Sequence, residues 1–420
     1  GDIFDLPIGF DAAHHALASR FPADRHGFAR LFGAIETMQN GLAHLRRAGD
    51  ERSIGGLLRA GFELRGLARD WRVSLDEMLR RFLADHEAAK FAVAANIAYY
   101  GDDPRRMAWP YFAMAQGGFL KSGGVFVRGG SRALSMKLAK VVTKAGGSVL
   151  LGREAVGVDL DGQGRPAFVR HVDPKNRAAD ERVGASQVFA NCAPSTLAAM
   201  LPESARGSLE RAYGGRALSI SLFQAHFGLG APPARLGLDR YGQIVLPEWM
   251  KSLRDFAACA PMLAADPGGK LPAYGIANYG AIDAGLADGG PILVSVVGVD
   301  RFDNWAALTP QEEKDRRERW LDAFQGALDR DYPGFGAAVS ERMFLNARSM
   351  RGFLNTPDGA VYGFAPLPPE RGVWAGMPRS PRTPIPGLYL ASAFAGSGGF
   401  TGAMRSGAQA AWAAMREKRG

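Results

Sequence analysis

The chain has 420 residues, enough for two or three structural units and a large core. Apolar residues make up 47% and charged residues 22%, as in ordinary soluble globular proteins. The formal net charge is +9, but the basic residues are scattered, and no RNA-binding signature or zinc-finger spacing accompanies them. Composition therefore argues against nucleic acid as a partner and leaves peripheral contact with anionic lipid open.

The two cysteines, Cys192 and Cys259, form no CxxC pair and no metal-ligand spacing, which favours a reducing, cytoplasmic compartment. No apolar run is long enough to span a bilayer, and no signal peptide is recognisable. The chain opens with Gly1-Asp2-Ile3 and has no initiating Met. We therefore expect it to be part of something longer.

Helical periodicity dominates the first third of the chain. Residues 25–47 and 53–71 place apolar side chains at helical spacing, and Ser74 and Glu77 form a capping box that predicts a further helix start. We assign residues 1–121 to the helical part of a substrate domain. The arginine-rich helices could rest on a membrane surface, but packing onto the rest of the protein is the simpler interpretation.

The next segment, residues 122–213, changes from helix to an α/β pattern. Gly123 and Gly124 lead into a helix predicted over 134–145. Strands are predicted over 148–151, 155–160, 168–172 and 187–192. We interpret this segment as the first part of a flavin-binding half.

Residues 214–377 supply the sheet and helices of the substrate domain. Thr309-Pro310-Gln311-Glu312 combines an N-cap, a proline at the first helical position and a glutamate at the third, and predicts a helix to about Leu328. The spacing of the apolar runs indicates an antiparallel sheet. Its strands are predicted over 218–227, 243–246, 274–279 and 292–299.

Two motifs resemble catalytic signatures and are set aside. His86-Glu87-Ala88-Ala89-Lys90 has a lysine where a zinc protease needs its second histidine, so we expect no metal there. Gly129-Gly130-Ser131-Arg132-Ala133 approximates a nucleophile elbow, but His226 is the only histidine after His171. We predict no metal site and name no catalytic residue.

The last forty residues read as a strand over 386–391, a glycine-rich loop over 395–402 and a helix over about 403–415. Such a loop brings backbone N–H groups close to a ligand, and a helix N-terminus adds partial positive charge. This arrangement suits an anionic or electron-rich cofactor. The spacing G-x-G-x-x-x-G is not the dinucleotide fingerprint, so a plain strand-to-helix connection is the alternative.

Taken in order, these segments resemble the flavin-dependent phytoene desaturase, carotenoid isomerase and retinol saturase family of the amine-oxidase-like flavoproteins. The likeness covers nearly the whole chain. The run from Thr383 through Leu388-Tyr389-Leu390-Ala391 and Gly399-Phe400-Thr401-Gly402 to Ala411 is its most specific part. Gly359-Ala360-Val361-Tyr362-Gly363 also matches the family in position.

The resemblance implies FAD as the cofactor and suggests which residues hold it. Ala155 matches a backbone contact on the adenine side, and Asn191 and Cys192 end a strand that passes near the cofactor. Ala393 lies in the step after the last strand, where Ser392-Ala393-Phe394 departs from the family's usual small polar step. The loop and helix start that meet the flavin ring correspond to Gly399, Phe400, Thr401, Gly402 and Met404.

The family's opening strand, its G-x-G-x-x-G turn and its ribose-binding acid have no counterpart in these residues. A βαβ unit takes roughly 30 residues or more. A truncation, a separate chain that carries the unit, and a degenerate homologue without flavin are the three explanations. We favour the first two, because a flavin loop would have no reason to survive without its cofactor.

We therefore expect an α/β flavoprotein fold that lacks the N-terminal βαβ unit and has a substrate domain of mixed sheet and helices. Residues 378–420 complete the flavin-binding half. The expected activity is an FAD-dependent oxidoreductase acting on C–C or C=C bonds of an apolar, isoprenoid or polyene substrate held in an apolar channel. A flavin-dependent cis–trans isomerase, an amine oxidase and a non-catalytic subunit are the alternatives.

Overall fold

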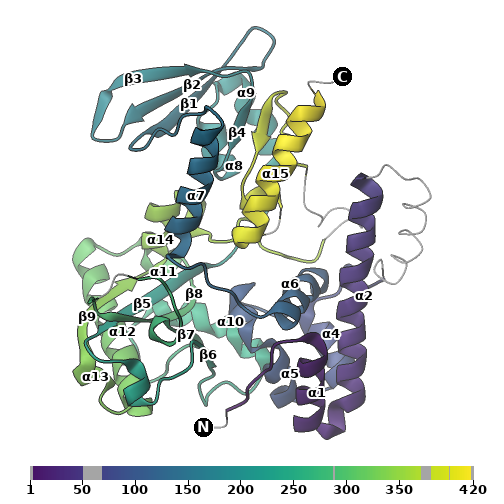
Figure 1. Ribbon diagram of the computed structural model, residues 1–420, viewed down its shortest axis with the longest axis vertical. Helices are drawn as coiled ribbons and strands as arrows, with labels where there is room; N and C mark the ends of the chain where they lie inside the picture. Colours follow the sequence, from purple (N-terminus) through teal and green to yellow (C-terminus); the bar gives the residue numbers. More distant parts are fainter. Residues whose placement is uncertain (1–2, 51–68, 287–288, 370–379, 397, 418–420) are drawn as a thin grey trace.

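The computed structural model describes residues 3–50, 69–286, 289–369, 380–396 and 398–417. The chain folds into two parts (Figure 1). One contains the N-terminal helices and a five-stranded sheet, and the other contains two small sheets with their helices. Within the described residues, no helix is both long and apolar enough to cross a bilayer.

The N-terminal helices pack around one apolar core, in which Phe28, Trp109 and Phe112 are completely or almost completely buried. The predicted helix at 25–47 is confirmed, and the oxygen of Ser74 accepts a hydrogen bond from the Glu77 amide at 3.2 Å, as its capping role requires. Most of the predicted helix at 53–71 lies outside the described residues. The helices are α1 (Phe10–Arg20), α2 (Arg25–Asp50), α4 (Leu75–Leu83), α5 (Glu87–Ala94) and α6 (Trp109–Ser122).

The large sheet is antiparallel throughout, in the order β6-β7-β8-β5-β9. Four of its strands confirm the prediction; β9 has no predicted counterpart, because its central residues Glu341 and Arg342 are charged, as suits an exposed edge strand. The strands are β5 (Ser221–Leu229), β6 (Gly242–Val245), β7 (Tyr274–Asn278), β8 (Ile292–Asp300) and β9 (Val339–Leu345).

Helix α12 (Pro310–Asp331) packs against this sheet and begins at the predicted capping box of Thr309 and Glu312. Phe223 of β5 stacks on Phe324 of α12 and on Phe344 of β9, with ring centroids 5.1 and 5.7 Å apart. Three short helices, α10 (Phe256–Cys259), α11 (Asp303–Ala306) and α13 (Phe335–Ala338), and helix α14 (Ala347–Leu354) complete this part.

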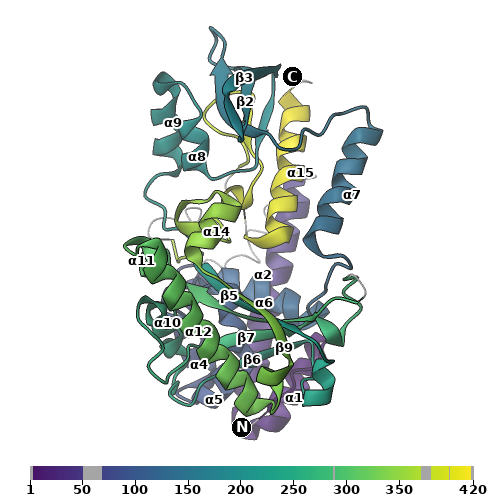
Figure 2. The ribbon, with the colours of Figure 1, turned by 90° about the vertical axis from the view of Figure 1, so that its left-hand side faces the viewer.

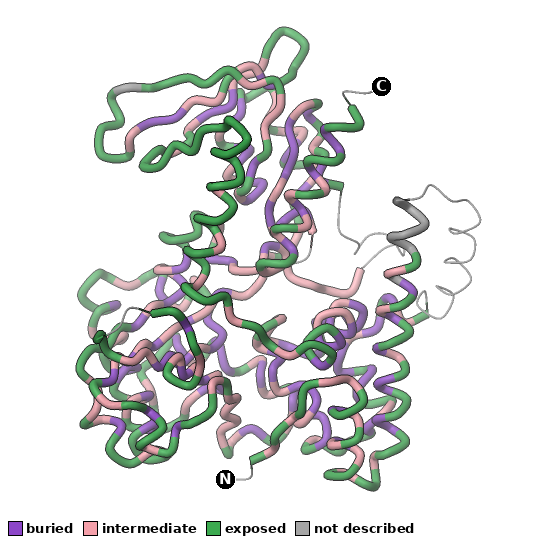
Figure 3. Tube along the Cα trace, viewed as in Figure 1, coloured by how far each residue is buried: buried purple, intermediate pink, exposed green. Residues whose placement is uncertain are grey.

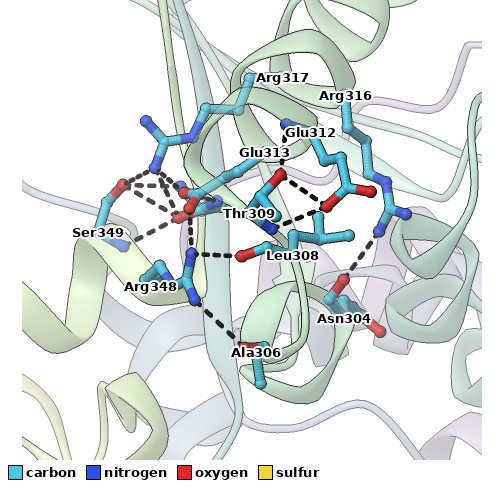
Figure 4. A network of polar contacts seen from close by, with 11 residues as sticks. Asn304, Ala306, Leu308, Thr309, Glu312, Glu313, Arg316, Arg317, Arg348 and Ser349 are labelled. Carbon is cyan, nitrogen blue, oxygen red and sulfur yellow. Dashed lines mark hydrogen bonds and ion pairs between the residues drawn. The ribbon is translucent and has the colours of Figure 1, made fainter.

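A polar network joins α12 to α14 (Figure 4). The nearly buried carboxylate of Glu313 accepts hydrogen bonds from Arg348 at 2.6 Å and from Asn346 at 2.8 Å, and it also pairs with Arg317. These donors hold the pKa of Glu313 below its ordinary value, although burial opposes them. Because both oxygens are occupied by structural partners, we assign this carboxylate to stability and not to catalysis.

The second part contains a three-stranded antiparallel sheet and a parallel pair of strands (Figure 2). Strands β1 (Glu154–Leu160), β2 (Pro166–Asp173) and β3 (Asn176–Gly184) form the former. Strands β4 (Val188–Ala190) and β10 (Leu388–Leu390) form the latter. The helices of this part are α7 (Gly130–Lys144), α8 (Pro194–Ala199), α9 (Glu203–Tyr213) and α15 (Gly399–Glu417).

The structure corrects the predictions here in two ways. Residues 148–151, predicted as a strand, are irregular and exposed, because no strand among the described residues offers them a partner. Strand β3 and helices α8 and α9 have no predicted counterpart. The predicted helix at 134–145, the hairpin of 155–160 with 168–172, and the strand at 187–192 are confirmed, the last as the shorter β4.

Candidate functional site

The parallel pair β4–β10 brings distant segments of the chain together at its carboxyl end. At this edge Leu390 lies opposite Ala190, and the Ala391 amide donates to the Ala190 carbonyl at 2.8 Å. The segment after each strand, which holds Asn191 and Cys192 on one side and Ala393 on the other, therefore starts at the same sheet edge. In open parallel sheets, ligands bind at this edge.

The surroundings of these three residues differ. Asn191 is exposed, whereas Cys192 and Ala393 are half-buried. Burial raises the pKa of the Cys192 thiol to about 11, so the thiol is neutral at physiological pH and a poor nucleophile. We therefore give Cys192 a packing role beside a ligand and not a role in covalent chemistry.

Helix α15 begins at Gly399, four residues before the predicted boundary. The predicted loop residues Gly399, Phe400, Thr401 and Gly402 are therefore the first turn of the helix, and Met404 follows in the next turn. Gly399 has φ +76°, a left-handed conformation that glycine adopts without strain and that turns the chain into the helix. The N–H groups of a first helical turn have no intrahelical acceptor and carry partial positive charge.

This helix start is open to a ligand. A Cβ placed on Gly399 would meet no atom within 4 Å, and Phe400 is 67% exposed. Gly402 faces the interior, as does Ser406, whose buried hydroxyl has no hydrogen-bond partner. An open glycine next to unsatisfied donors is what an electron-rich ring or an anion requires.

A second segment crosses the glycine loop at close range. A Cβ on Gly398 would lie 2.6 Å from the Tyr362 Cβ, and one on Gly363 would lie 2.8 Å from the carbonyl oxygen of Ala393. The rings of Phe364 and Phe394 meet edge to face, with centroids 5.1 Å apart. The loop and residues 362–364 therefore pack backbone against backbone, which only glycine allows at these positions.

Tyrosines gather beside this crossing. The hydroxyl of Tyr111 interacts with the backbone amide of Gly398, and its ring lies 6.4 Å from that of Tyr100. Burial raises the pKa values of Tyr100, Tyr111 and Tyr362, so these phenols stay neutral in the physiological range. They form an uncharged, largely apolar wall next to the loop.

A buried hydrogen-bond network fixes this wall. The side-chain oxygen of Gln116 accepts from Asn96 at 2.8 Å and from the Tyr100 hydroxyl at 3.0 Å. The Gln116 amide nitrogen donates to the Val93 carbonyl at 2.9 Å. Asn96 and Gln116 are both buried, so the network holds Tyr100 in one orientation.

A large groove starts at the same network. It has a volume of about 2170 Å³ and runs between the N-terminal helices and the strands β6 and β7. This volume exceeds the roughly 300–1,000 Å³ of pockets for drug-sized ligands. Its wall is mostly aromatic and aliphatic, but it also carries charged side chains of both signs, namely Arg20, Arg240, Lys270, Arg330, Asp5, Glu248, Asp322 and Asp331. Representative lining residues are Phe91, Tyr100, Gln116, Phe119, Trp249 and Tyr274.

The structure thus brings together most of the residues predicted to bind the cofactor, and Ala155 is the exception. Ala155 is exposed in the three-stranded sheet, opposite His171 of β2. Sequence reasoning missed Tyr111 and Tyr362 as neighbours of the loop. For Tyr362, the run Gly359–Gly363 was the one sequence feature that pointed to the loop. No local sequence feature indicated that Tyr111 would contact it.

No group of three or more metal-ligating side chains occurs in the part of the chain that the structure describes. In the segment that resembles a zinc protease, Lys90 pairs with Glu87 at 2.6 Å, and His86 pairs with Asp24. Both ends of that motif are therefore engaged by carboxylates, Lys90 by Glu87 of the motif itself and His86 by Asp24 of a distant segment.

Comparison with known proteins finds relatives by structure only. No protein-family model matches the chain, and no curated protein sequence matches it. An oxidoreductase from Methanosarcina mazei aligns over 82% of this chain and 68% of its own, with 14% sequence identity and a TM-score of 0.51. Putrescine oxidase bound to putrescine aligns over 83% of this chain and 69% of its own, again with 14% identity and a TM-score of 0.51.

These similarities concern the fold. About a third of each of those chains has no counterpart in this one. At 14% identity, the alignment carries no residue roles with it. The chain has the mixed α/β fold that these oxidoreductases share.

Proposed function

We propose that the protein is an FAD-dependent oxidoreductase that acts on an apolar substrate. The single observation that carries this proposal is the convergence of three features at one place. These are the carboxyl ends of β4 and β10, the open first turn of α15, and a neutral tyrosine wall that leads into a large apolar groove.

The residues at the loop fit the redox end of such a cofactor. Gly399 leaves space for a flat ring, and the first-turn amides of α15 supply donors where negative charge develops on reduction. Phe400 and Met404 offer exposed apolar surface beside it. The glycine-rich turn that would hold the pyrophosphate is not recognisable in the sequence, so we assign only the ring end to these residues.

The chain's own contribution is orientation and the exclusion of water. FAD, when bound, would supply hydride transfer to or from a substrate carbon. The network of Gln116, Asn96 and Tyr100 keeps the end of the groove rigid, and the tyrosine wall adds no charge there. A long isoprenoid or polyene would suit the volume and the aromatic lining of the groove. Dehydrogenation of a C–C bond, saturation of a C=C bond and a redox-neutral cis–trans isomerisation all fit this arrangement.

Amine oxidation is the second candidate, because putrescine oxidase is among the structures that share the fold. The groove lining also contains carboxylates. Asp322 pairs with Arg342, and Asp331 pairs with Arg330. Glu248 could attract a cationic amine. An amine substrate would give peroxide and an aldehyde or imine. A polyene substrate would give a product that differs by two hydrogens or, for an isomerase, by geometry alone.

The test begins with protein isolated from its source in the state in which it occurs there. We expect flavin absorbance in the blue part of the visible spectrum and release of FAD on denaturation, identified by chromatography and mass. The holoprotein is then assayed anaerobically with a polyene, with the same polyene plus a quinone acceptor, and with putrescine under air. A colourless preparation that contains no FAD would contradict the proposal.

A matched pair of variants connects the site to the activity. Gln116→Leu removes the acceptor that holds Asn96 and Tyr100, and we expect it to lower turnover of the groove substrate more than FAD content. Gln163→Leu alters a side chain in the β1–β2 turn, away from the groove, and serves as the control. Equal activity of the two variants would argue against this groove as the substrate site.

A further inference from the structure

The large sheet carries a group of polar side chains on the face that α12 does not cover. Along β5, buried and half-buried residues alternate strictly (Figure 3). The buried set, which includes Phe223 and Phe227, packs in the core beneath α12. Successive side chains of a strand point to opposite faces, so the half-buried set, with Gln224 and His226, lies on the other face.

The strand register connects this face to the groove. Gly242 of β6, which lines the groove, lies opposite Ala277 of β7, and Ala277 lies opposite Ser295 of β8. Ser295 lies opposite His226 of β5. Neighbouring strands are about 4.8 Å apart, so His226 is about 14 Å across the sheet from the groove lining.

Small residues leave space above the sheet between the groove and this polar group. In the next row of paired residues, Gly275 of β7 lies opposite Val297 of β8, and Val297 lies opposite Gln224. A Cβ at Gly242 would meet no atom within 4 Å, and one at Gly275 would meet none closer than 3.5 Å. One row further, Val299 is buried in the core of the N-terminal helices. A ligand chain that leaves the groove can therefore lie over β6 and β7 and reach Gln224.

Three side chains hold one another in a fixed order on this face. The carboxamide oxygen of Gln224 only accepts hydrogen bonds, so His226 Nε2, at 3.0 Å, carries the ring proton and donates to it. His226 Nδ1 then accepts a hydrogen bond from the Ser295 hydroxyl at 2.7 Å. Burial lowers the pKa of His226, which keeps the ring in this neutral form at physiological pH. Ser295 is only 1% exposed, so this chain of hydrogen bonds is anchored inside the sheet.

This order leaves the amide nitrogen of Gln224 with two N–H donors. Neither donor makes a hydrogen bond to any residue that the structure describes. The neighbours of Gln224 on this face, Leu222, Val297 and Leu345, are apolar and offer no side-chain acceptor. Two donors held in place on an apolar surface match the two lone pairs of one carbonyl oxygen.

Other ligand ends fit these donors less well. The two rows of paired residues that pass through Gln224 and His226 contain no charged side chain, and the next residue on this face of β9 is Glu341. An anionic end would lie near Glu341 without a cation to neutralise it. An ammonium group can only donate, so it cannot pair with the Gln224 amide, and a hydrocarbon end would leave both donors unsatisfied.

Strand β5 also sets the distance from Gln224 to the cofactor end. The amide of Tyr362, beside the glycine loop, donates to the Ser219 hydroxyl at 2.9 Å. Gln224 follows Ser219 by five residues. At about 3.4 Å per residue, the two are roughly 17 Å apart along the strand.

We propose that Gln224, positioned by His226 and Ser295, binds a carbonyl oxygen of the substrate roughly 17 Å from the reacting end. The substrate is then an isoprenoid or other apolar chain that ends in an aldehyde or a ketone remote from the flavin. The identity of this ligand as the substrate rests on the proposed function. The donor site itself rests only on the geometry of β5 and β8.

The test measures binding to the protein isolated from its source, with the variants expressed there. The probes are geranylgeranial, geranylgeraniol and the matching hydrocarbon, and quenching of tryptophan fluorescence reports binding. Wild-type protein should bind the aldehyde at least about tenfold more tightly than the hydrocarbon, because two donors gain an acceptor.

Gln224→Glu keeps the oxygen that accepts from His226 and replaces both N–H donors by a second oxygen. This variant should lose the preference for the aldehyde and should bind the alcohol, whose hydroxyl donates, more tightly than the aldehyde. Its affinity for the hydrocarbon should be unchanged, which shows that the groove is intact. Gln163→Glu makes the same chemical change in the β1–β2 turn and should bind all three probes as the wild type does.

Ser295→Ala tests the positioning role, because it removes the hydroxyl that orients His226. We expect it to weaken binding of the aldehyde alone, by about three- to tenfold. Equal weakening for aldehyde and hydrocarbon would show a merely structural role for Ser295 and would overturn that part of the proposal. Equal binding of aldehyde and hydrocarbon by the wild type, or an unchanged preference in Gln224→Glu, would overturn the carbonyl site.

These measurements separate the site from the proposed function, because binding is read without turnover. A colourless protein that keeps the Gln224-dependent preference would overturn the oxidoreductase function and support the carbonyl site. An active, flavin-containing protein that lacks the preference would overturn the carbonyl site alone.

Discussion

Tyr362 crosses the glycine loop at close range, so the direction in which a substitution there changes the free energy of unfolding can be predicted. In Gly398→Ala, the new Cβ would lie 2.6 Å from the Tyr362 Cβ and 2.7 Å from the Tyr362 carbonyl oxygen. Ordinary van der Waals contacts begin at 3.4 Å, so the two segments must separate by several tenths of an ångström. The obstructing atoms belong to the backbone and to a Cβ, and no flexible side-chain end can move aside.

We expect this overpacking to lower the free energy of unfolding by about 1–3 kcal/mol. Gly407→Ala is the matched control on the neighbouring helix α15. A Cβ at Gly407 would meet no atom within 4 Å, and alanine in a helix interior is about 0.5–1 kcal/mol more favourable than glycine. The same chemical change should therefore destabilise the protein at one position and stabilise it at the other.

Urea unfolding monitored by tryptophan fluorescence measures both effects, and the FAD content of each variant measures the effect on the site. We expect Gly398→Ala to unfold at lower urea and to retain less FAD, and Gly407→Ala to unfold at higher urea with its FAD unchanged. If Gly398→Ala were as stable as the Gly407→Ala protein, the close approach of Tyr362 to the loop would be refuted.

Three further predictions concern buried ionisable groups. Burial raises the pKa of Asp300 from 3.8 to about 6, so its ionisation destabilises the fold as pH rises through that interval. At about 1.4 kcal/mol per pKa unit, unfolding measurements from pH 4 to 6.5 should show a loss of about 2 kcal/mol that Asp300→Asn lacks. Glu313 has a lowered pKa, so its stabilisation is present at neutral pH and is lost as pH falls below 4.5. Glu313→Gln should lower the free energy of unfolding by about 3 kcal/mol at pH 7 and should remove the loss of stability below pH 4.5, as urea titrations would measure. An unchanged urea midpoint would contradict the network. Finally, Cys192 should react with iodoacetamide at pH 8 roughly a hundredfold more slowly than free cysteine, as mass spectrometry of the labelled peptide would show.

Local sequence signals determined much of the secondary structure. Capping residues such as Ser74 and Thr309 fix helix starts through hydrogen bonds to amides three residues away, so the sequence alone locates them. The strands β5 to β8 and the terminal strand–loop–helix are likewise predictable, because alternating or continuous apolar runs and glycines signal them locally. The boundary of α15 is not, since Gly399 can begin a helix as readily as it can sit in a loop.

The candidate site depended on contacts between residues far apart in the chain. Pairing of β4 with β10 joins residues about 200 positions apart, and the approach of Tyr111 and Tyr362 to Gly398 follows from packing that no local pattern encodes. Residues 148–151 show the converse: their composition predicts a strand, but a strand needs a partner for its backbone hydrogen bonds. The sequence determined which segments could be helices, strands and ligand loops, and tertiary structure decided which of them met, because burial and strand pairing depend on neighbours distant in the chain.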